Sequence, residues 1–277
     1  IKVGGSGQDP FFQTYPHAGH AGAGQVAGLV SDGVQLVGGT AWTFARPELT
    51  HRFDVLFVDE AGQFSLANLV GISRCTTDIV LLGDQRQLAQ PIQGSHPGET
   101  GLSVLDYLLE DHVVIPPELG IFLDRTWRMH PDLCAFVSDA FYEGQLGHAP
   151  QTANRRLLLP DTHSGNITRE TGLLYIPVPH TGNTYGSDEE VARIREIIEE
   201  LTTLHHTDEK GHDVGPLRPE DILVVSPYNV QVRKLREGLP DGVPVGTVDK
   251  FQGQEAPVAV LSMGASDVSD SGRGLSF

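Results

Sequence analysis

The 277-residue sequence has little cysteine, few basic side chains and no long apolar run. Two cysteines, Cys75 and Cys134, are too few for a disulfide framework or a zinc site, so we expect reduced core residues. Nineteen Lys and Arg against 36 Asp and Glu give a net charge of −17, which opposes non-specific nucleic-acid binding driven by bulk charge. A locally basic groove remains compatible with that charge. Without an apolar run of about 18 residues or a charged-then-apolar leader, the expected location is cytoplasmic.

A phosphate-binding loop of the common type is also missing. Such a loop reads Gly-x-x-x-x-Gly-Lys-Ser/Thr after a strand, and no Gly-Lys-Ser/Thr occurs in the sequence. Residues 1–33 are rich in glycine and histidine, and we expect a flexible loop there, with His17 and His20 in solvent. The chain does not begin with Met, and residues 272–277 carry no terminating signal. We therefore expect a piece of a longer protein.

The segment 53–63, FDVLFVDEAGQ, is the most informative stretch that is present. Its apolar residues 55–58 are too few for a helix and lack polar alternation, which predicts a strand buried on both faces. Asp59 and Glu60 follow at once. At the carboxyl end of a parallel strand, one acid can hold a hydrated magnesium ion while the other orients an attacking water. A chance Asp-Glu pair is the alternative explanation.

Other predicted strands also end in polar segments. Residues 79–82 lead into GDQRQL, 222–225 into SPYN, and 245–248 into DKFQGQE, while 258–261 is the last strand. A shorter strand at 34–37 ends in GGTAW, where a glycine pair and a hydroxyl suit close approach to a phosphate, although a plain turn fits nearly as well. Successive buried strands with polar ends predict an α/β fold built on a doubly wound, mainly parallel sheet.

Helices are predicted between these strands by capping residues and by apolar side chains at helical spacing. The expected helices span residues 65–72, 103–110, 131–141, 188–204 and 230–237, and the last carries the one dense basic patch, Arg233, Lys234 and Arg236. The aromatic stripe of 131–141 is expected in the core.

Two prolines, Pro116 and Pro117, mark the best domain boundary, so the expected domains are 1–115 and 116–277. Residues 147–172 show little regular pattern and are expected to form a surface excursion. For the histidines 205, 206 and 212, a polar loop at a helix C-terminus is preferred over a metal site.

Taken in order, the strand-end segments resemble the motifs of superfamily 1 helicases, whose motors are AAA-type ATPase domains. DEAGQ is similar to motif II, GDQRQL to motif III, TWRMHP to the element that opens the second motor domain, and VGTVDKFQGQE to motif V. The likeness is strongest to the branch that contains the RNA helicase of nonsense-mediated decay and its DNA-processing relatives. GGTAW, GSHP and VVSPYN further resemble the C-terminal helicase portion of bacterial proteins with an upstream RecB-like nuclease domain.

The resemblance implies two incomplete RecA-like domains, each a mainly parallel sheet flanked by helices, with ATP and Mg²⁺ as cofactors. It implies that Asp59 holds magnesium, Glu60 acts as base toward the hydrolytic water, and Gln87 senses the terminal phosphate. Arg128 would stabilise the transition-state charge from the second domain, where arginine fingers contribute on the order of 10³ to 10⁵ in rate.

Further roles follow from the same resemblance. Trp127 would lie near the nucleotide base, although a purely structural tryptophan fits almost as well. Gly253 and Glu255 would close over the nucleotide. Single-stranded DNA or RNA is the implied partner, with DNA favoured and 5′ to 3′ movement suggested, and its backbone would be followed without sequence preference by Thr40, Pro227, Tyr228 and Thr247.

Two departures from the family pattern matter. The phosphate-binding loop and the arginine-bearing motif VI are both missing, which is most simply explained by truncation at both ends. We therefore expect these 277 residues alone to hydrolyse ATP poorly. A degenerate module that binds nucleic acid or a partner without hydrolysis is the main alternative, and a simple nucleoside kinase or GTPase leaves TWRMHP and FQGQE unexplained.

Overall fold

The computed structural model describes residues 1–88 and 97–266, so residues 94–96 of the GSHP segment lie outside it. The chain divides into two compact units, Ile1–His112 and Val113–Phe277. Within the part of the chain that is described, no helix is both long and apolar enough to cross a membrane. The expected boundary after residue 115 stays a prediction, since compactness alone does not define a domain's fold.

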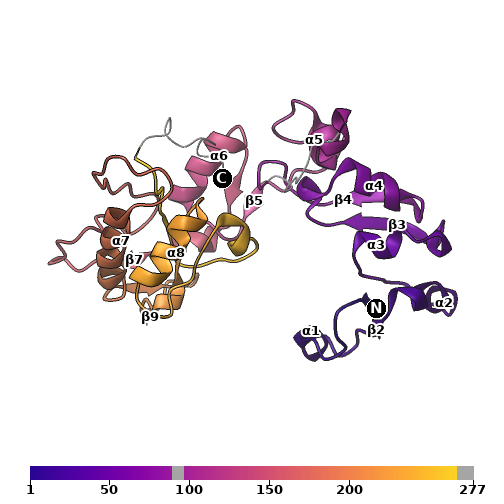
Figure 1. Ribbon diagram of the computed structural model, residues 1–277, viewed down its shortest axis with the longest axis horizontal. Coiled ribbons are helices and arrows are strands. Elements are labelled where there is room, and N and C mark those ends of the chain that lie inside the picture. Colours follow the sequence, from indigo (N-terminus) through magenta and orange to yellow (C-terminus); the bar gives the residue numbers. More distant parts are fainter. Residues whose placement is uncertain (89–96, 267–277) are drawn as a thin grey trace. The chain divides into compact units, whose positions relative to one another are not determined.

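The first unit is a mixed α/β structure with two small parallel sheets (Figure 1). Its strands and α-helices are β1 (Lys2–Val3), α1 (Pro10–Thr14), β2 (His20–Ala21), α2 (Val26–Ser31), α3 (Ala41–Phe44), β3 (Phe53–Val58), α4 (Leu66–Ser73), β4 (Thr76–Leu81) and α5 (Val104–Leu109).

Serine side chains begin two helices of this unit, as the sequence predicts. The Ser65 hydroxyl accepts a hydrogen bond from the Asn68 N–H at the start of α4, and the Ser103 hydroxyl accepts one from the Asp106 N–H at the start of α5. Each bond satisfies a backbone donor that has no partner inside the helix. Both predicted helices are confirmed within one residue at each end.

The central pair of strands, β3 and β4, is parallel, with Val58 opposite Leu81 at the carboxyl ends. The prediction that β3 is buried on both faces is wrong, because Val55 is 41% exposed and Phe57 is 63% exposed. Leu56 and Val58, which point to the other face, are buried. In the described part of the unit this sheet has two strands, and the face that carries Val55 and Phe57 is exposed.

The predicted strand at 34–37 is also wrong. Those residues form no ladder, and the one pairing nearby is an isolated bridge between Lys2 and Gly38. The N-terminal segment is more ordered than a flexible loop, because β1 and β2 pair in parallel, Lys2 with His20 and Val3 with Ala21. The histidine and glycine content of residues 1–33 therefore gave no indication of the small sheet formed by β1 and β2.

The described part of the second unit combines two parallel sheets with one antiparallel sheet (Figure 1). Its strands and α-helices are β5 (Arg125–Thr126), α6 (Pro131–Phe141), β6 (Gly147–His148), β7 (Leu157–Leu158), α7 (Asp188–Leu201), β8 (His205–Thr207), β9 (Asp213–Pro216), β10 (Ile222–Val225), α8 (Asn229–Gly238), β11 (Val245–Gly246) and β12 (Val258–Leu261). The parallel sheets are β11-β10-β12 and β5-β6, and the antiparallel sheet is β7-β8-β9.

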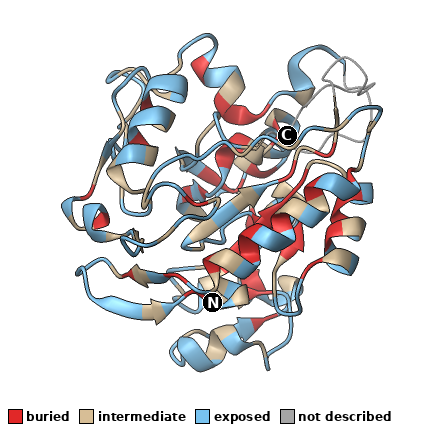
Figure 2. Ribbon diagram, turned by 90° about the vertical axis from the view of Figure 1, so that its left-hand side faces the viewer, coloured by how far each residue is buried: buried red, intermediate tan, exposed pale blue. Residues whose placement is uncertain are grey.

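The core of this unit forms around β10, which lies between β11 and β12 in a parallel sheet. All four residues of β10 are buried, which explains their continuous apolar sequence. The buried residues of α7 and α8 pack against it (Figure 2), among them Ile198, Leu201 and Leu235. The aromatic stripe of α6 is not core as predicted: Phe136 is 52% exposed and Phe141 47%, while Cys134 and Ser138 form the buried side.

The excursion at 147–172 is held to the core more firmly than its sequence suggests. Glu200 of α7 accepts hydrogen bonds from the backbone N–H groups of Asn166 (2.8 Å) and Ile167 (2.8 Å). Burial opposes the ionised form of Glu200, but these backbone bonds outweigh it and lower the pKa of the carboxyl below its ordinary value. The antiparallel sheet β7-β8-β9, which the sequence did not predict, adds a second attachment.

Candidate functional site

The acid pair lies directly beyond β3, where a sharp change of backbone direction presents it to solvent. Glu60 has φ 53° and ψ 44°, a left-handed conformation that is uncommon for a residue with a side chain. The Asp59 carboxylate accepts a hydrogen bond from the Glu60 N–H (3.0 Å), which stabilises this turn. Both side chains are exposed, and among the described residues the Glu60 carboxylate has no hydrogen-bond partner. Strained, solvent-facing acids at a strand end are typical of functional sites.

The segment after β4 packs tightly against the segment after β3. The Ala61 N–H donates to the Leu82 carbonyl (2.8 Å), and the Leu82 N–H donates to the Val58 carbonyl (2.9 Å). Two glycines allow this approach: a Cβ on Gly62 would lie 2.4 Å from the Asp84 carbonyl oxygen, and one on Gly83 would lie 2.6 Å from the Ala61 nitrogen. The two polar segments thus meet backbone to backbone.

Gln87 lies on the second of these segments. Its side-chain amide donates to the Asp84 carboxylate (3.1 Å), and the same carboxylate accepts from the Arg86 N–H (2.9 Å). The first unit therefore brings Asp59, Glu60 and Gln87 to the carboxyl edge of one parallel pair, as expected for polar residues at the ends of neighbouring parallel strands.

In the second unit, Arg128 and Glu255 are brought together although 127 residues separate them in sequence. The Arg128 Nε donates to a Glu255 carboxylate oxygen at 2.8 Å, and both side chains are more than half exposed. The Arg128 backbone is held on both sides, since its N–H donates to the Thr126 hydroxyl and its carbonyl accepts from Arg155. The guanidinium is thus an accessible cation on a fixed backbone.

Two further predicted residues flank this ion pair in sequence. Trp127 is 64% exposed, which is more than a purely structural tryptophan requires. Gly253 has φ 73°, a left-handed conformation that favours glycine, in the turn that leads to Glu255. The segments 127–128 and 253–255 therefore lie at one face of the second unit.

The predicted nucleic-acid residues of the second unit follow two neighbouring strands. Val225 of β10 pairs with Gly246 of β11, so Pro227 and Thr247 come one or two residues beyond adjacent strand ends. Tyr228 is the N-cap residue of α8 and is partly buried. Thr40, the fourth of these residues, is exposed in the first unit at the N-cap of α3.

The sequence interpretation missed Tyr185. Its ring contacts the Tyr228 ring edge to face, with centroids 5.2 Å apart, and it remains 42% exposed. The signal was present in the sequence, because Tyr185 closely precedes the capping serine of α7, Ser187. The two rings form a small aromatic platform beside the ends of β10 and β11.

A buried polar network behind this platform was also missed. Glu190 of α7 accepts from the Ser262 hydroxyl (2.6 Å), the Gly264 N–H and a His180 ring nitrogen (3.1 Å). Gln231 of α8 donates to the same Ser262 hydroxyl (2.9 Å) and accepts from the Ser187 N–H (2.8 Å). Each polar group in the network has a partner, so the network fixes the starts of α7 and α8 relative to the end of β12.

The predicted basic patch on α8 is less available than the sequence suggests. Lys234 pairs with Asp188 at 2.6 Å, and Arg236 donates to the Val245 carbonyl. Arg233 remains exposed. The polar loop expected at histidines 205, 206 and 212 is wrong for two of them, because His205 and His206 lie in strand β8. His205 pairs with Asp213 across the sheet. Residues 1–88 and 97–266 contain no cluster of three or more His, Cys, Asp or Glu that could hold a metal ion.

Comparisons with known proteins agree with the strand-end motifs. A family model described as an AAA domain matches residues 101–275, more than half of the chain. The chain is 30% identical over 227 residues to the 3'-5' exoribonuclease HELZ2 of Mus musculus, covering 75% of this chain and 7% of that protein.

Two other relatives carry names that refer to DNA. The DNA polymerase alpha-associated DNA helicase A of Schizosaccharomyces pombe is 29% identical over 226 residues, covering 76% of this chain and 32% of the relative. The DNA-binding protein SMUBP-2 of Mesocricetus auratus is 31% identical over 224 residues, covering 76% and 21%. The chain thus spans a third or less of the length of these relatives. It belongs to the AAA-domain family, among proteins that are superfamily 1 helicase-like.

Proposed function

We propose that the chain is part of an ATP-driven translocase or helicase that moves on single-stranded nucleic acid, with DNA as the favoured track. The observation that carries this proposal is the backbone contact between the segments after β3 and β4, at Gly62 and Gly83. This contact supports joint action of an acid pair and a polar sensor on one phosphate group. The DNA-related names of two relatives support the choice of track.

In this proposal Glu60 accepts a proton from the attacking water, and Gln87 donates a hydrogen bond to the terminal phosphate. Arg128, from a second RecA-like domain spanning 116–277, stabilises the charge of the transition state. Trp127 contacts the nucleotide base, and Gly253 and Glu255 close over the nucleotide, with Gly253 allowing the turn that leads to Glu255. The proposal gives both RecA-like domains, 1–115 and 116–277, a part in the hydrolysis of one ATP.

Magnesium fits the residues at the end of β3. It prefers oxygen ligands and usually keeps several waters, so that one carboxylate together with substrate phosphates is sufficient. Asp59 is exposed there, and one of its carboxylate oxygens accepts from a backbone N–H while the other has no hydrogen-bond partner among the described residues. When bound, the ion would neutralise charge on the transferred phosphoryl group. The proposal assigns Asp59 the task of holding it.

Nucleic acid would contact Thr40 in the first unit and Pro227, Tyr228 and Thr247 in the second. The Tyr185–Tyr228 pair supports stacking of bases, which is tolerant of sequence because every base has a flat face. With a net charge of −17, binding depends on this local surface and not on bulk attraction. A cytoplasmic location and a RecB-like nuclease domain in the same protein complete the proposal.

This function is tested by measuring whether single-stranded nucleic acid stimulates the ATPase of the natural, full-length protein. Oligo-dT is expected to raise the ATPase rate, and Glu60→Gln to abolish it. Glu110→Gln is the matched control, because Glu110 is also an exposed glutamate with a positive φ, 49°, in the same unit. The purified 277 residues are expected to bind oligo-dT but to turn over ATP slowly, since they contain no Gly-Lys-Ser/Thr.

Two outcomes would contradict the proposal. If no single strand, DNA or RNA, stimulated hydrolysis, the non-hydrolysing binding module would be the better account. Steady ATP turnover by the 277 residues alone, abolished by Glu60→Gln, would contradict the expected dependence on a phosphate-binding loop. A Tyr228→Ala variant is expected to weaken oligo-dT binding about tenfold, whereas Tyr175→Ala, which removes a tyrosine that is 87% exposed, is the matched control.

A further inference from the structure

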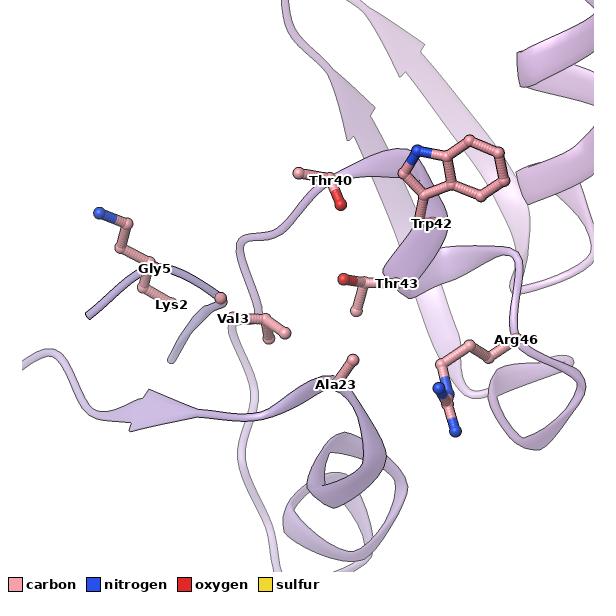
Figure 3. A pocket seen from close by; sticks show the side chains of 9 residues that line it. Lys2, Val3, Gly5, Ala23, Thr40, Trp42, Thr43 and Arg46 are labelled. Carbon is pink, nitrogen blue, oxygen red and sulfur yellow. The ribbon is translucent and has the colours of Figure 1, made fainter. Parts of the chain in front are cut away.

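The pocket beside α3 in the first unit, with a volume of about 480 Å³, is lined by Lys2 and Trp42 among others (Figure 3). The Lys2 ammonium is engaged by the Asp9 carboxylate (2.7 Å) and lies 4.7 Å from the centre of the Phe11 ring. The Trp42 ring is turned away from Lys2 in Figure 3 and is 86% exposed. These groups do not converge on one ligand. In the second unit, by contrast, two side chains converge on the backbone of Arg128.

Arg128 lies in the connection between β5 and α6, outside both elements. β5 ends at Thr126 and α6 begins at Pro131, so residues 127–130 belong to neither. Backbone groups in such a connection commonly take their partners from side chains or water. The Arg128 carbonyl accepts a hydrogen bond from the Arg155 Nη1 at 3.0 Å, and the Arg128 N–H donates to the Thr126 hydroxyl at 3.2 Å. Arg155 therefore holds the backbone from which the Arg128 side chain extends.

The guanidinium of Arg155 also reaches the hairpin formed by β8 and β9. Its Nη2 donates to the Glu209 carboxylate at 3.4 Å, and Glu209 lies in the loop between these two strands. A guanidinium presents its donors in a planar, fixed fork, so a bond to one nitrogen sets the direction of the others. Both side chains of this ion pair are at least a third exposed, so it adds little to stability. Its effect is to orient Arg155 toward the Arg128 carbonyl.

The hairpin loop that carries Glu209 is itself held by local hydrogen bonds. The Asp208 carboxylate accepts from the backbone N–H groups of Lys210 (2.8 Å) and His212 (2.9 Å). The His212 bond is the main reason why the pKa of the Asp208 carboxyl lies below its ordinary value. The Asn154 side chain donates to the Glu209 carbonyl (2.9 Å). Glu209 is thus fixed to the preceding segment through its backbone as well as its side chain.

We infer that Arg155 is a positioning residue for Arg128, and that the β8–β9 hairpin holds Arg155 in place through Glu209. Arg155 would act through the Arg128 backbone, without touching the nucleotide. The inference rests on the proposed function, in which Arg128 stabilises the transition state of hydrolysis. A misplacement of about 1 Å can cost about 10²-fold in rate, so the loss of Arg155 should slow hydrolysis and leave ATP binding unchanged.

The kinetics of strand-stimulated ATP hydrolysis by the natural, full-length protein test this inference. Arg155→Ala is expected to lower kcat about tenfold or more and to change the KM for ATP by less than about twofold. Arg155→Lys should recover part of the loss, because lysine keeps the charge but lacks the fork. Arg156→Ala is the matched control with an expected wild-type kcat, because Arg156 is the neighbouring arginine and pairs with Glu170 (4.0 Å).

A double-variant cycle separates positioning from general damage to the fold. In an Arg128→Ala background, Arg155→Ala should change the rate by less than about twofold, because the side chain that Arg155 positions is gone. Single-turnover hydrolysis with the protein in excess keeps these slow rates measurable. If Arg155→Ala does not fold, Arg155→Lys takes its place in the cycle, with a partial loss of kcat that also disappears without Arg128.

The outcomes separate this inference from the function on which it rests. If Arg128→Ala slows hydrolysis and Arg155→Ala does not, the inference is overturned while the proposed function stands. A loss of the same factor with and without Arg128 would make Arg155 a general structural residue and would also overturn it. A wild-type kcat in Glu209→Gln would overturn the part given to the hairpin. If Arg128→Ala hydrolyses ATP at the wild-type rate, or no single strand stimulates hydrolysis, the proposed function fails first.

Discussion

A methyl group on Gly62 is expected to separate the two segments on which the proposed catalytic edge depends. In Gly62→Ala the new Cβ would lie 2.4 Å from the Asp84 carbonyl oxygen and 2.9 Å from its carbonyl carbon. Both are backbone atoms, so no side chain can rotate away to make room. Overpacking of this kind costs about 1–3 kcal/mol.

Hydrogen exchange measures this cost where it arises. The Ala61 and Leu82 amides donate the two bonds that join the segments, at 2.8 Å and 2.9 Å. A loss of about 2 kcal/mol in local stability corresponds to about 30-fold faster exchange of these amides. The ATPase of the protein as the cell makes it should fall in parallel.

Gly71→Ala is the matched control for this substitution. Gly71 lies inside α4, and nothing lies within 4 Å of a Cβ placed there. Replacing a helical glycine by alanine stabilises by about 0.5–1 kcal/mol, so exchange in Gly71→Ala should be unchanged or slower. If the Ala61 and Leu82 amides of Gly62→Ala exchanged at the same rate as in wild type, the claim that the segments are in backbone contact would be refuted.

Two further predictions concern the second unit. Glu200→Gln should lower the free energy of unfolding by about 1–3 kcal/mol at neutral pH, because it weakens bonds to partly buried backbone N–H groups. Since the folded-state pKa of Glu200 is lowered, its contribution is present above its ordinary pKa of 4.5 and is lost as pH falls through the folded value, so urea titrations of wild type and variant should converge in acid. Arg128→Ala should leave the urea midpoint unchanged, because its ion pair with Glu255 is exposed, yet reduce ATPase on the order of 10³-fold or more. A large loss of stability with normal ATPase would contradict the role given to Arg128.

Local signals in the sequence predicted the elements that depend on nearby residues. Capping serines marked α5 and α7, and Pro131 marked the start of α6. The all-apolar run 222–225 correctly predicted a fully buried strand, because β10 has a neighbour on each side. In such cases the composition of the segment and its surroundings agree.

The same reasoning failed where burial depends on distant parts of the chain. Residues 55–58 are as apolar as β10, yet Val55 and Phe57 are exposed, because the face of β3 to which they point is left uncovered by the described residues. The pairing of Lys2 with His20 and the bond of Glu200 to Asn166 join residues far apart in sequence, and no local pattern signals them. The site residues were predicted by the family resemblance, and the structure adds the Arg128–Glu255 pair and Tyr185.

The account depends most on the proposal that Glu60 and Arg128 act on one nucleotide. Spin labels on Ala67→Cys in α4 and Ala135→Cys in α6 would report this, because both positions are exposed. Cys75 and Cys134 are buried, and burial raises the pKa of both thiols, so they should stay unlabelled. In the protein as the cell makes it, a non-hydrolysable ATP analogue with magnesium is predicted to collapse the distance distribution between the labels to a single short distance. An unchanged distribution in the presence of bound analogue would contradict the motor account.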